Sequence, residues 1–363
     1  MSPASYLTAP PRVARASIAP SVPIEASRTS TGNAARTARS IGLMRVAAVD
    51  LGTNTTRLLV AEVEDGRVRD VTRTTRITRL GEGVDERRRL LPVPIARTRN
   101  VLSDYRRTIE ELGAERTLVI ATSAVRDAEN GEAFLGEVER SYGFSTRLLS
   151  GHEEAMLAFR GVSAEREISA GTLIVDVGGG STELVAGGPD GIRWHDSLDV
   201  GSVRLTERFL HSDPPTPEEL RECRIAVADL LAQRVPGDVR TKTEFVIGVA
   251  GTITSLAALD LGLDEYDSKR VHGSVLSASG LERQLERLAS VPVAVRRTLR
   301  PLEPDRAPVI VGGAVIASEL LNSLLVDSLE VSERDILDGA ALAAAELPAP
   351  EEGAAPPGAY TCC

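Results

Sequence analysis

Two short segments of the chain, one beginning at Asp50 and the other at Asp176, carry the same pattern of residues suited to phosphate chemistry. In each, an apolar β-branched run delivers the Asp, a loop of small residues follows, and a second apolar run returns. The loops consist of Gly52, Thr53, Asn54 and Thr55 in the first copy and of Gly178, Gly179, Gly180 and Ser181 in the second. Small residues let the backbone approach a ligand and reach positive φ, and such loops can aim N–H groups and hydroxyls at phosphate oxygens. The repeat predicts a duplicated domain that holds a phosphate between its halves.

Three carboxylates of these segments are candidate metal ligands. Asp50 and Asp176 end the first apolar run of each segment, and Glu183 begins the return run of the second. Carboxylates, waters and substrate phosphates are the ligands that Mg²⁺ prefers, so this set predicts Mg²⁺ (or Mn²⁺) as the cofactor. Glu183 has an alternative interpretation as a surface strand residue, because alternation turns every second side chain outward.

A candidate general base lies just before the second segment. Ser150 and Glu153 have capping-box spacing, so Glu153 is explained as part of a helix cap. Glu154 is not needed for the cap and points about 100° further round the helix. Close to a cleft, its carboxylate could take a proton from an attacking water. The competing interpretation is that both glutamates are ordinary first-turn acids favoured by the helix dipole.

Further phosphate contacts are expected from a helix start and from arginines beside small-residue turns. Gly251 and Thr252 follow an apolar run and open a predicted helix, whose N-terminus can bind an anion. Bidentate guanidinium groups suit phosphate, and the arginines next to such turns are Arg57, Arg79, Arg126, Arg204 and Arg270. Some of these, Arg126 and Arg204 among them, are expected to face phosphate, and the others to be surface charges. His272, a lone histidine, is expected to be structural.

The elements that must position these residues alternate between strands and helices from Met44 onward, which indicates an α/β fold. The expected strands cover 45–49, 57–64, 68–78, 116–122, 145–149, 172–176, 182–186, 192–198, 245–250 and 308–311. The expected helices cover 95–112, 130–141 with Asn130 as cap, 150–159, 216–233 with Thr216 and Glu219 as a capping box, a helix from 251, and 332–346. Three strands followed by helix, strand and helix appear twice. This arrangement resembles the two duplicated ribonuclease-H-like domains of the actin-like ATPase superfamily, with a cleft between them.

Composition separates two ordered domains from two flanking segments. Residues 44–165 and 166–346 are expected to form the first and second actin-like domains. Residues 1–43 are rich in Ser, Ala, Thr, Pro and Arg without hydrophobic periodicity, which predicts a disordered N-terminal extension, with a transit peptide as the alternative. Residues 347–363 are expected to form a disordered tail.

Charge and cysteine usage exclude several classes of protein. The net charge of −10 argues against a nucleic-acid coat, which needs a basic surface. A polyanionic ligand must therefore be attracted by a local basic site. Cys223, Cys362 and Cys363 form neither a disulfide framework nor a metal-ligand spacing, which favours a cytoplasmic protein with Cys223 in its core. No run of about 18 apolar residues occurs, so no membrane span is expected.

Taken together, these motifs resemble the exopolyphosphatase / guanosine pentaphosphate phosphohydrolase (Ppx/GppA) family from about Met44 to Glu346. The motifs that carry the resemblance occupy 48–55, 79–84, 121–126, 150–155, 176–183, 201–204, 248–252 and 335–339. The resemblance implies that Glu154 is the catalytic glutamate and that Asp176 and Glu183 handle metal and phosphate. It also implies that the loops 52–55 and 178–181 bind phosphate. Met156 stands where other members often carry Arg, so one basic contact is expected to be missing.

The resemblance implies a phosphohydrolase that removes the terminal orthophosphate from inorganic polyphosphate or guanosine pentaphosphate, by Mg-assisted in-line attack of water. The expected partners are these small polyanions and a second copy in a homodimer, but neither nucleic acid nor a membrane. Longer members continue into further helical domains that this chain lacks, so short polyphosphates are favoured. Two alternatives stay open: a small-molecule kinase of the actin-like fold, and a nonenzymatic regulator that binds guanosine polyphosphates.

Overall fold

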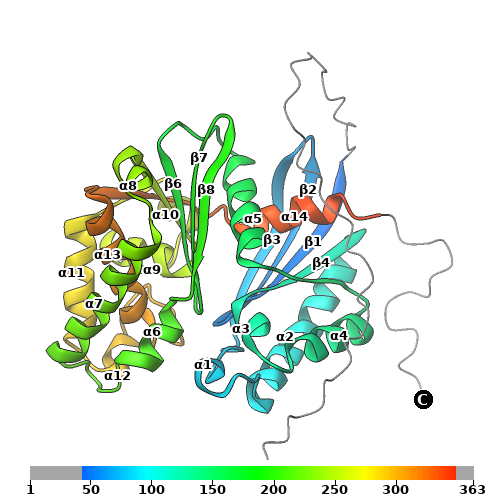
Figure 1. The fold of residues 1–363 in the computed structure, drawn as a ribbon. Coiled ribbons are helices and arrows are strands. Elements are labelled where there is room, and N and C mark those ends of the chain that lie inside the picture. Colours follow the sequence, from blue (N-terminus) through cyan, green and yellow to red (C-terminus); the bar gives the residue numbers. More distant parts are fainter. Residues whose placement is uncertain (1–42, 349–363) are drawn as a thin grey trace, which may run out of the picture. The chain divides into compact units, whose positions relative to one another are not determined.

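The structure, a computed structural model, describes residues 43–348, and these form two mixed β-sheets built on one plan (Figure 1). The strand order is β3-β2-β1-β4-β5 in the first sheet and β10-β11-β9-β6-β7-β8 in the second. Taken from its other edge, the second order begins β8-β7-β6-β9-β11, which matches the first sheet strand for strand. In both sheets the first three strands in sequence are antiparallel, and two later strands run parallel to the first: β4 and β5 in the first sheet, β9 and β11 in the second. Strand β10 adds an antiparallel edge to the second sheet. The predicted α/β class and its duplication are confirmed.

The expected strands other than 308–311 and the six expected helices are present, with ends that shift by up to four residues. Eight helices of the described residues were not expected: α1, α3, α6, α8, α10, α11, α12 and α13. The strands are β1 (Met44–Leu51), β2 (Thr55–Glu64), β3 (Arg67–Ile77), β4 (Arg116–Ala121), β5 (Ser145–Leu148), β6 (Thr172–Val177), β7 (Thr182–Gly188), β8 (Gly191–Leu198), β9 (Phe245–Val249), β10 (Val275–Ser277) and β11 (Ser328–Val331). The helices are α1 (Val84–Arg87), α2 (Pro92–Glu111), α3 (Ser123–Asp127), α4 (Gly131–Tyr142), α5 (Gly151–Ser163), α6 (Ser202–Phe209), α7 (Pro217–Arg234), α8 (Gly237–Lys242), α9 (Ala250–Asp260), α10 (Ser268–Val271), α11 (Ala278–Ala289), α12 (Val293–Arg296), α13 (Ile310–Leu324) and α14 (Ile336–Ala345).

The register of the two hairpins places the chemically important side chains in equivalent positions. Asp50 stands opposite Arg57 in the β1–β2 pair, and Asp176 stands opposite Glu183 in the β6–β7 pair. Directly opposed residues of an antiparallel pair project from the same face of the sheet. Each hairpin therefore presents two charged side chains together, beside the loop that ends its first strand.

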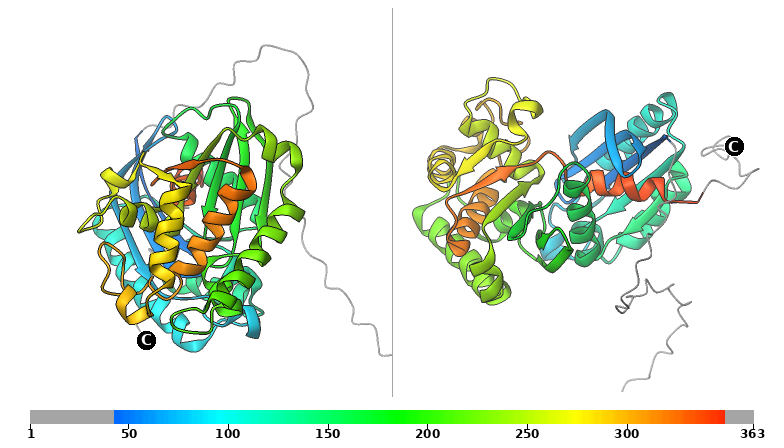
Figure 2. Two further views of the ribbon diagram at one scale, coloured as in Figure 1. Left: turned by 90° about the vertical axis from the view of Figure 1, so that its left-hand side faces the viewer. Right: turned by 90° about the horizontal axis from the view of Figure 1, so that it is seen from above.

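The first sheet is covered by helices on both faces. Val49 lies on the face that packs against α2 and α4, where it joins a core with Leu102 and Phe134. Leu59 lies on the other face, which packs against Leu337 and the rest of α14. In Figure 2 (right) the red α14 lies along the blue strands of this sheet, although it is the last helix in sequence. The domain boundaries predicted at 165 and 346 stay a prediction. Residues 336–345 fall within the predicted second domain in sequence, but they pack on the first sheet.

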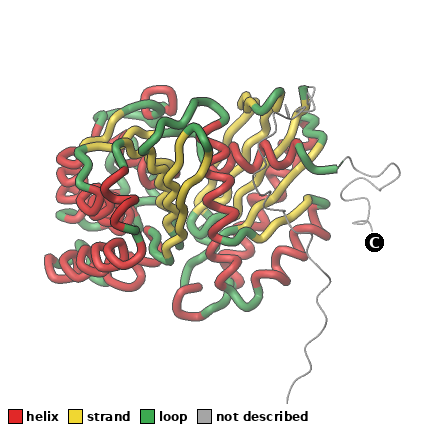
Figure 3. The backbone as a smooth tube through the Cα atoms, turned by 45° about the horizontal axis from the view of Figure 1, so that its top comes forward, coloured by secondary structure: helices red, strands yellow, loops and turns green. Residues whose placement is uncertain are grey.

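The second sheet is covered in the same way. Leu173 and Leu184 lie in the large core that α7, α11 and α13 complete, and Figure 3 shows these red helices beside the yellow strands. Ile174 and Val185 lie on the opposite face and pack against Ala155 of α5. Helix α5 also contacts α14 along its length. The helix that carries the candidate base is thus held between the two sheets.

Three expectations about elements need correction. Residues 308–311 do not form a strand, because Ile310 begins α13; a short β-branched run cannot be told from a buried helix by pattern alone. Strands β10 and β11 were not expected, because they have only 3 and 4 residues and little alternation. Asn130 lies at the N-cap of α4 as expected, but its side chain makes no cap hydrogen bond and bonds instead to both backbone groups of Leu90.

The remaining expectations concern burial, membranes and the chain ends. Cys223 is fully buried in the second core, as expected. Within residues 43–348, no helix is both long and apolar enough to cross a membrane. The predictions for residues 1–42 and 349–363, including Cys362 and Cys363, lie outside the described residues.

Candidate active site

The two small-residue loops close in the same way. The Gly52 N–H donates to the Thr55 carbonyl oxygen at 3.0 Å, and the Gly178 N–H donates to the Ser181 carbonyl oxygen at 3.1 Å. The loops also touch each other, because a Cβ on Gly180 would overlap the hydroxyl of Ser123 and approach that of Thr53. None of the loop glycines has a positive φ. The freedom of glycine to reach positive φ is therefore not used in these loops, and the glycines serve the close approach of one loop to the other.

Two further motifs support the loops from behind. The Gly81 N–H donates to the Thr53 carbonyl oxygen at 2.8 Å, so the 79–84 motif holds the first loop. The Ser202 and Val203 N–H groups donate to the carbonyl oxygens of Gly178 and Gly179 at 2.9 and 2.8 Å. The N-terminus of α6 is therefore occupied by the second loop and is not a free anion site. These bonds explain why the motifs at 79–84 and 201–204 accompany the loops.

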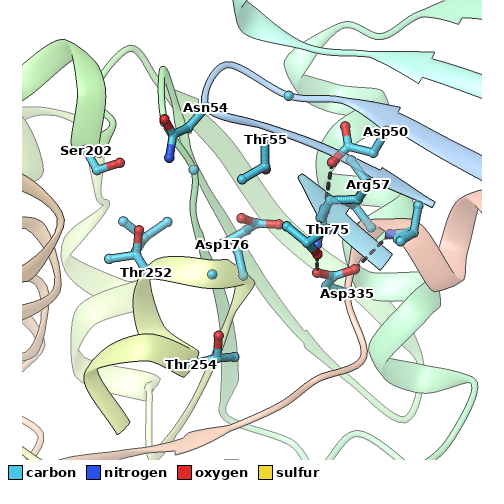
Figure 4. Close-up of a pocket in the computed structure, with 18 of the residues that line it drawn as sticks. Asp50, Asn54, Thr55, Arg57, Thr75, Asp176, Ser202, Thr252, Thr254 and Asp335 are labelled. Atoms are coloured by element: carbon cyan, nitrogen blue, oxygen red, sulfur yellow. Dashed lines mark hydrogen bonds and ion pairs between the residues drawn. The ribbon is translucent and has the colours of Figure 1, made fainter. Parts of the chain in front are cut away.

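A cavity of about 610 Å³ lies beside the two loops. Its lining includes nearly all of the predicted site residues: Asp50, Gly52, Thr53, Asn54, Thr55, Glu154, Asp176, Gly178, Gly179, Gly180, Ser181, Glu183, Gly251 and Thr252. Figure 4 shows Asp50 and Arg57 on one side of this cavity, Thr252 and Thr254 of α9 on another, and Asp176 between them. Residues that lie more than 200 positions apart in the sequence thus meet in one place.

Glu154 lies in the first turn of α5, behind the capping box that Ser150 and Glu153 form as predicted. Its residue is only 3% exposed. Burial raises the pKa of Glu154 to about 8; the ion pair with Arg126 opposes this shift, and the neighbouring carboxylates Asp50 and Asp176 add to it. A carboxyl group with a pKa near neutrality is suited to accept a proton from water at physiological pH.

Glu183 and Asp176 face the same cavity from the second hairpin. The Ser197 hydroxyl donates to Oε1 of Glu183 at 2.8 Å and so fixes one of its oxygens. Burial raises the pKa of Glu183 to about 8, and the nearby Glu154 adds to the shift. Burial and then Glu183 raise the pKa of Asp176 well above its usual value. The positive charge near these two carboxylates is therefore too small to offset the effect of burial on their ionised forms.

The residues present could supply some of the ligands of a divalent cation, and substrate oxygens and waters would have to supply the others. The Oδ1 atom of Asp50 is buried without any hydrogen-bond partner, which is a free ligand position for a cation. Among the described residues, no group of three or more His, Cys, Asp and Glu side chains is close enough to hold a metal ion. Mg²⁺ is commonly held by one or two carboxylates together with waters and substrate phosphates, and this donor set fits that mode.

Arg126 and Arg204 do not line the cavity, in contrast to what the sequence predicted. Arg126 pairs with Glu154 and donates to the Leu149 carbonyl oxygen at 2.8 Å. Arg204 is 8% exposed and forms ion pairs with Asp85 and Asp127. Both guanidinium groups are thus engaged by protein oxygens.

Arg57 lines the cavity, whereas Arg79 and Arg270 do not. The Arg57 guanidinium lies 2.9 Å from Oδ2 of Asp50 and also pairs with Asp335, the N-cap of α14. Although burial acts the other way, the nearby Arg57 lowers the pKa of Asp335 below its usual value. The sequence placed Asp335 only at the start of the last helix and in the 335–339 motif; the structure shows that it forms a capping box with Asp338 and also lines the cavity.

Arg306 is a cavity-lining residue that no sequence signal indicated. It lies in the loop before α13, far from every motif, and its guanidinium lies against Gly251 at the start of α9. Burial lowers its pKa, and no carboxylate of the described chain forms an ion pair with it. The side chain offers a cation at a helix N-terminus that has no side-chain cap. Lone arginines carry no pattern, so only the fold could reveal this one.

Ala250, which lines the cavity, has a φ of 67° in the left-handed region. Such a conformation costs a residue other than Gly about 1 kcal/mol or more. It occurs at the first residue of α9 and turns the backbone of Gly251 and Thr252 toward the cavity. His272 lies outside the cavity, where its Nδ1 accepts from the Glu333 N–H at 3.1 Å, in agreement with a structural role.

Comparison with known proteins assigns this architecture to a family. The model of the Ppx/GppA phosphatase family matches residues 59–345. The chain is 42% identical to Exopolyphosphatase 2 of Mycobacterium tuberculosis over 295 residues, covering 78% of this chain and 92% of that protein. It is 30% identical to the guanosine-5′-triphosphate,3′-diphosphate pyrophosphatase of Aeromonas hydrophila, covering 69% of this chain and 52% of that protein.

Solved structures agree with the sequence comparisons. A crystal structure of an exopolyphosphatase-like protein superposes with a TM-score of 0.79 at 35% identity, covering 83% of this chain and 97% of that one. The Aquifex aeolicus member of the Ppx/GppA family superposes with a TM-score of 0.71 at 34% identity, covering 83% and 97%. The comparisons give no support to the kinase or to the nonenzymatic regulator. The chain belongs to the Ppx/GppA phosphatase family, whose members are hydrolases of phosphoanhydride bonds that depend on a divalent metal ion.

Proposed function

We propose that the protein releases the terminal orthophosphate from guanosine pentaphosphate or from short inorganic polyphosphates, by attack of a water molecule that Glu154 activates. The observation that carries this proposal is the meeting of Glu154, Asp176 and Glu183 with the two loops around one cavity. Phosphoryl transfer requires mainly positioning and charge stabilisation, and these residues offer both.

The proposal assigns each group a role that the geometry supports. The loops 52–55 and 178–181 would hold the terminal phosphate through N–H groups and hydroxyls, with the amide of Asn54 as a further donor. Glu154 would accept a proton from the water whose oxygen attacks the terminal phosphorus. The bridging P–O bond breaks on the opposite side, and the shortened polyanion keeps its electron pair.

A divalent cation, Mg²⁺ or Mn²⁺, would be held by one or two of the carboxylates Asp176, Glu183 and Asp50 together with waters and substrate oxygens. When bound, it supplies positive charge against the oxygens of the transferred group. The chain's own residues explain why it is needed: the carboxylates have raised pKa values because burial leaves them short of positive charge. We expect the reaction to take place in the cytoplasm, since Cys223 is a free thiol. The homodimer implied by the family resemblance stays a prediction, which sedimentation velocity of the purified protein would test.

The test measures phosphate release from tripolyphosphate, long-chain polyphosphate and guanosine pentaphosphate, with and without Mg²⁺. We expect Glu154→Gln to lower turnover about 10²–10⁴-fold, the range of general-base catalysis, without loss of fold. Glu153→Gln is the matched control, because Glu153 serves the capping box and should affect stability rather than turnover. Near-normal turnover by Glu154→Gln would refute its role as the base, and no release from any of the three substrates would refute the function.

A further inference from the structure

One group of cavity residues has no part in the reaction described above. This distal group, defined as Tyr266, Glu303, Arg306 and Glu333, lines the same cavity as the catalytic carboxylates. Tyr266 lies just before α10, Glu303 and Arg306 lie before α13, and Glu333 lies between β11 and α14. Three separate loops of the second half of the chain thus converge to place an aromatic ring and two carboxylates in a cavity that otherwise suits a polyanion.

The charges of the distal group do not suit a phosphate chain. Every phosphate of such a chain is negatively charged, and the group offers two carboxylates for one guanidinium. Like charges brought together outside bulk water repel strongly. Burial raises the pKa of Glu333, which the hydroxyl of Tyr266 only partly offsets. Among the described side chains, Tyr266 gives the Glu333 carboxylate its one hydrogen bond, so a neutral ligand part with N–H groups would fill further acceptor positions.

Glu333 and Tyr266 are already arranged with respect to each other. The Tyr266 hydroxyl donates to Oε1 of Glu333, which uses one of about four acceptor positions of the carboxylate. The Glu333 N–H is held by Nδ1 of His272 at 3.1 Å, so the backbone is fixed as well. Tyr266 is 45% exposed, which leaves part of its ring free for contact with a planar ligand. Oε2 of Glu333 stays available for a second donor.

We propose that the distal group binds the guanine base of a nucleotide whose phosphates reach the two loops. Guanine presents two adjacent donors, N1–H and the 2-amino group, and a carboxylate accepts from both. Adenine turns a bare N1 acceptor to the same position, which a carboxylate repels. The ring of Tyr266 offers a stacking surface for a base. Arg306 at the N-terminus of α9 is placed to contact the phosphates between base and loops.

This inference rests on the proposed function and selects its nucleotide branch over inorganic polyphosphate. The test measures the Kd values of the guanosine, inosine and adenosine 5′-triphosphate 3′-diphosphates and of tripolyphosphate by calorimetry with Mg²⁺. Glu154→Gln protein is used so that no ligand is consumed. We expect guanosine to bind about tenfold or more tightly than adenosine, because a site built to pair with donors rejects a base that lacks them. Inosine, which keeps N1–H and lacks the 2-amino group, should fall between them.

The second variant, Glu154→Gln with Glu333→Gln, should lose the preference for guanosine and should bind tripolyphosphate at least as tightly, because a like charge is removed. Glu153→Gln in the same background is the matched control: Glu153 lies in the α5 cap, outside the distal group, and this variant should keep the preference. Equal affinity for the three nucleotides, or a preference that survives Glu333→Gln, would overturn the assignment. These outcomes are distinct from failure of the proposed function, in which no phosphate is released even where guanosine binds tightly.

Discussion

The side chain of Asn54 marks the cavity as a ligand site more directly than any charged group does. Asn54 is 5% exposed, and neither its Nδ2 nor its Oδ1 has a hydrogen-bond partner. An unsatisfied buried amide costs the free protein about 1–3 kcal/mol. Such a group persists where a ligand supplies the partners, and the donor Nδ2 suits a phosphate oxygen.

We therefore expect Asn54→Ala to separate stability from binding. The free energy of unfolding without ligand should stay within about 1 kcal/mol of the unchanged protein or rise, because the replacement removes an unsatisfied group. The affinity for substrate should fall about tenfold, in keeping with the loss of one hydrogen bond to a charged group. Urea unfolding and calorimetric titration measure the two effects.

Asn130→Ala is the matched control at this scale. Both amide atoms of Asn130 are bonded to the backbone of Leu90, at 2.8 and 3.1 Å, so this change should cost about 1–3 kcal/mol of stability and leave affinity unaltered. If Asn54→Ala were as destabilising as Asn130→Ala and bound substrate normally, the interpretation of Asn54 as a ligand contact would be wrong.

At this scale, the sequence predicts residues that belong to a local pattern. Asp176, Glu183 and the loop glycines, which line the cavity, were predicted because each stands at a fixed place in a strand-loop-strand repeat. Arg306 was missed because a single arginine in a loop has no repeat to identify it. Arg204 was predicted to face phosphate because it follows a small-residue turn, but its guanidinium pairs with Asp85 and Asp127, which are distant in sequence.

At the scale of elements, the contact between α5 and α14 controls how the base is held. A Cβ on Gly161 of α5 would overlap the carbonyl oxygen of Asp335, at the start of α14. The two helices can therefore lie this close only with glycine at the crossing. Because Asp335 also pairs with Arg57 in the cavity, a displacement of either helix would reach the site.

We expect Gly161→Ala to destabilise the protein by about 2 kcal/mol or more, since backbone cannot yield as a flexible side chain does and overpacking costs about 1–3 kcal/mol. Turnover should fall with it, because Glu154 lies on the same helix. Thermal unfolding and phosphate release measure both.

Gly136→Ala on α4 is the control for glycine replacement within a helix. A Cβ there would meet only the end of the Arg140 side chain, at 3.2 Å, so the change should be neutral or stabilising by up to about 1 kcal/mol. If the Gly161→Ala protein were as stable and active as the Gly136→Ala protein, α5 and α14 could move apart at Gly161 without cost, and the expectation would be wrong.

The order of the longer strands and of six helices was predictable, whereas the other helices, α11 and α13 among them, were not. Capping boxes at Ser150 and Thr216 fixed the starts of α5 and α7, because these signals lie within four consecutive residues. The 308–311 run was misassigned because α13 is apolar on all sides, so periodicity gave no signal. The packing of α14 on the first sheet depends on contacts between the two ends of the described chain, which no local pattern contains.

At the scale of the whole molecule, the buried carboxylates of the cavity couple stability to pH and to metal. The chain has a net charge of −10, and Glu154, Asp176 and Glu183 add buried negative charge to one cavity when ionised. Their pKa values lie above the usual range in the folded protein, at about 8 for Glu154 and Glu183. A folded-state pKa above the unfolded one means that folding favours the protonated form.

It follows that the metal-free protein should lose stability as pH rises from about 6 to 8.5. The contribution of a carboxyl with a raised pKa is fully present below its unfolded pKa near 4.5 and is lost as pH rises through the folded pKa near 8, by up to ~1.4 kcal/mol per pH unit and group. Carboxyls with lowered pKa values, such as Asp335 and Asp85, act in the opposite direction only below about pH 5. His195, whose pKa burial lowers, likewise acts below about pH 6.5.

Added Mg²⁺ should reverse this loss at pH 8.5, since a cation that binds only the folded, ionised form stabilises it by mass action. The Tm measured at pH 6 and 8.5, with chelator and with Mg²⁺, checks the effect. Glu183→Gln should flatten the pH dependence of the metal-free protein because one of the titrating groups is gone, and it should weaken the rescue by Mg²⁺. Glu153→Gln, which alters a glutamate of the α5 cap instead, should leave both slopes as they are. A metal-free Tm that rises toward pH 8.5 would contradict the raised pKa values of these carboxyl groups. A Glu183→Gln protein that Mg²⁺ stabilises as strongly as the unchanged protein would place the metal away from Glu183.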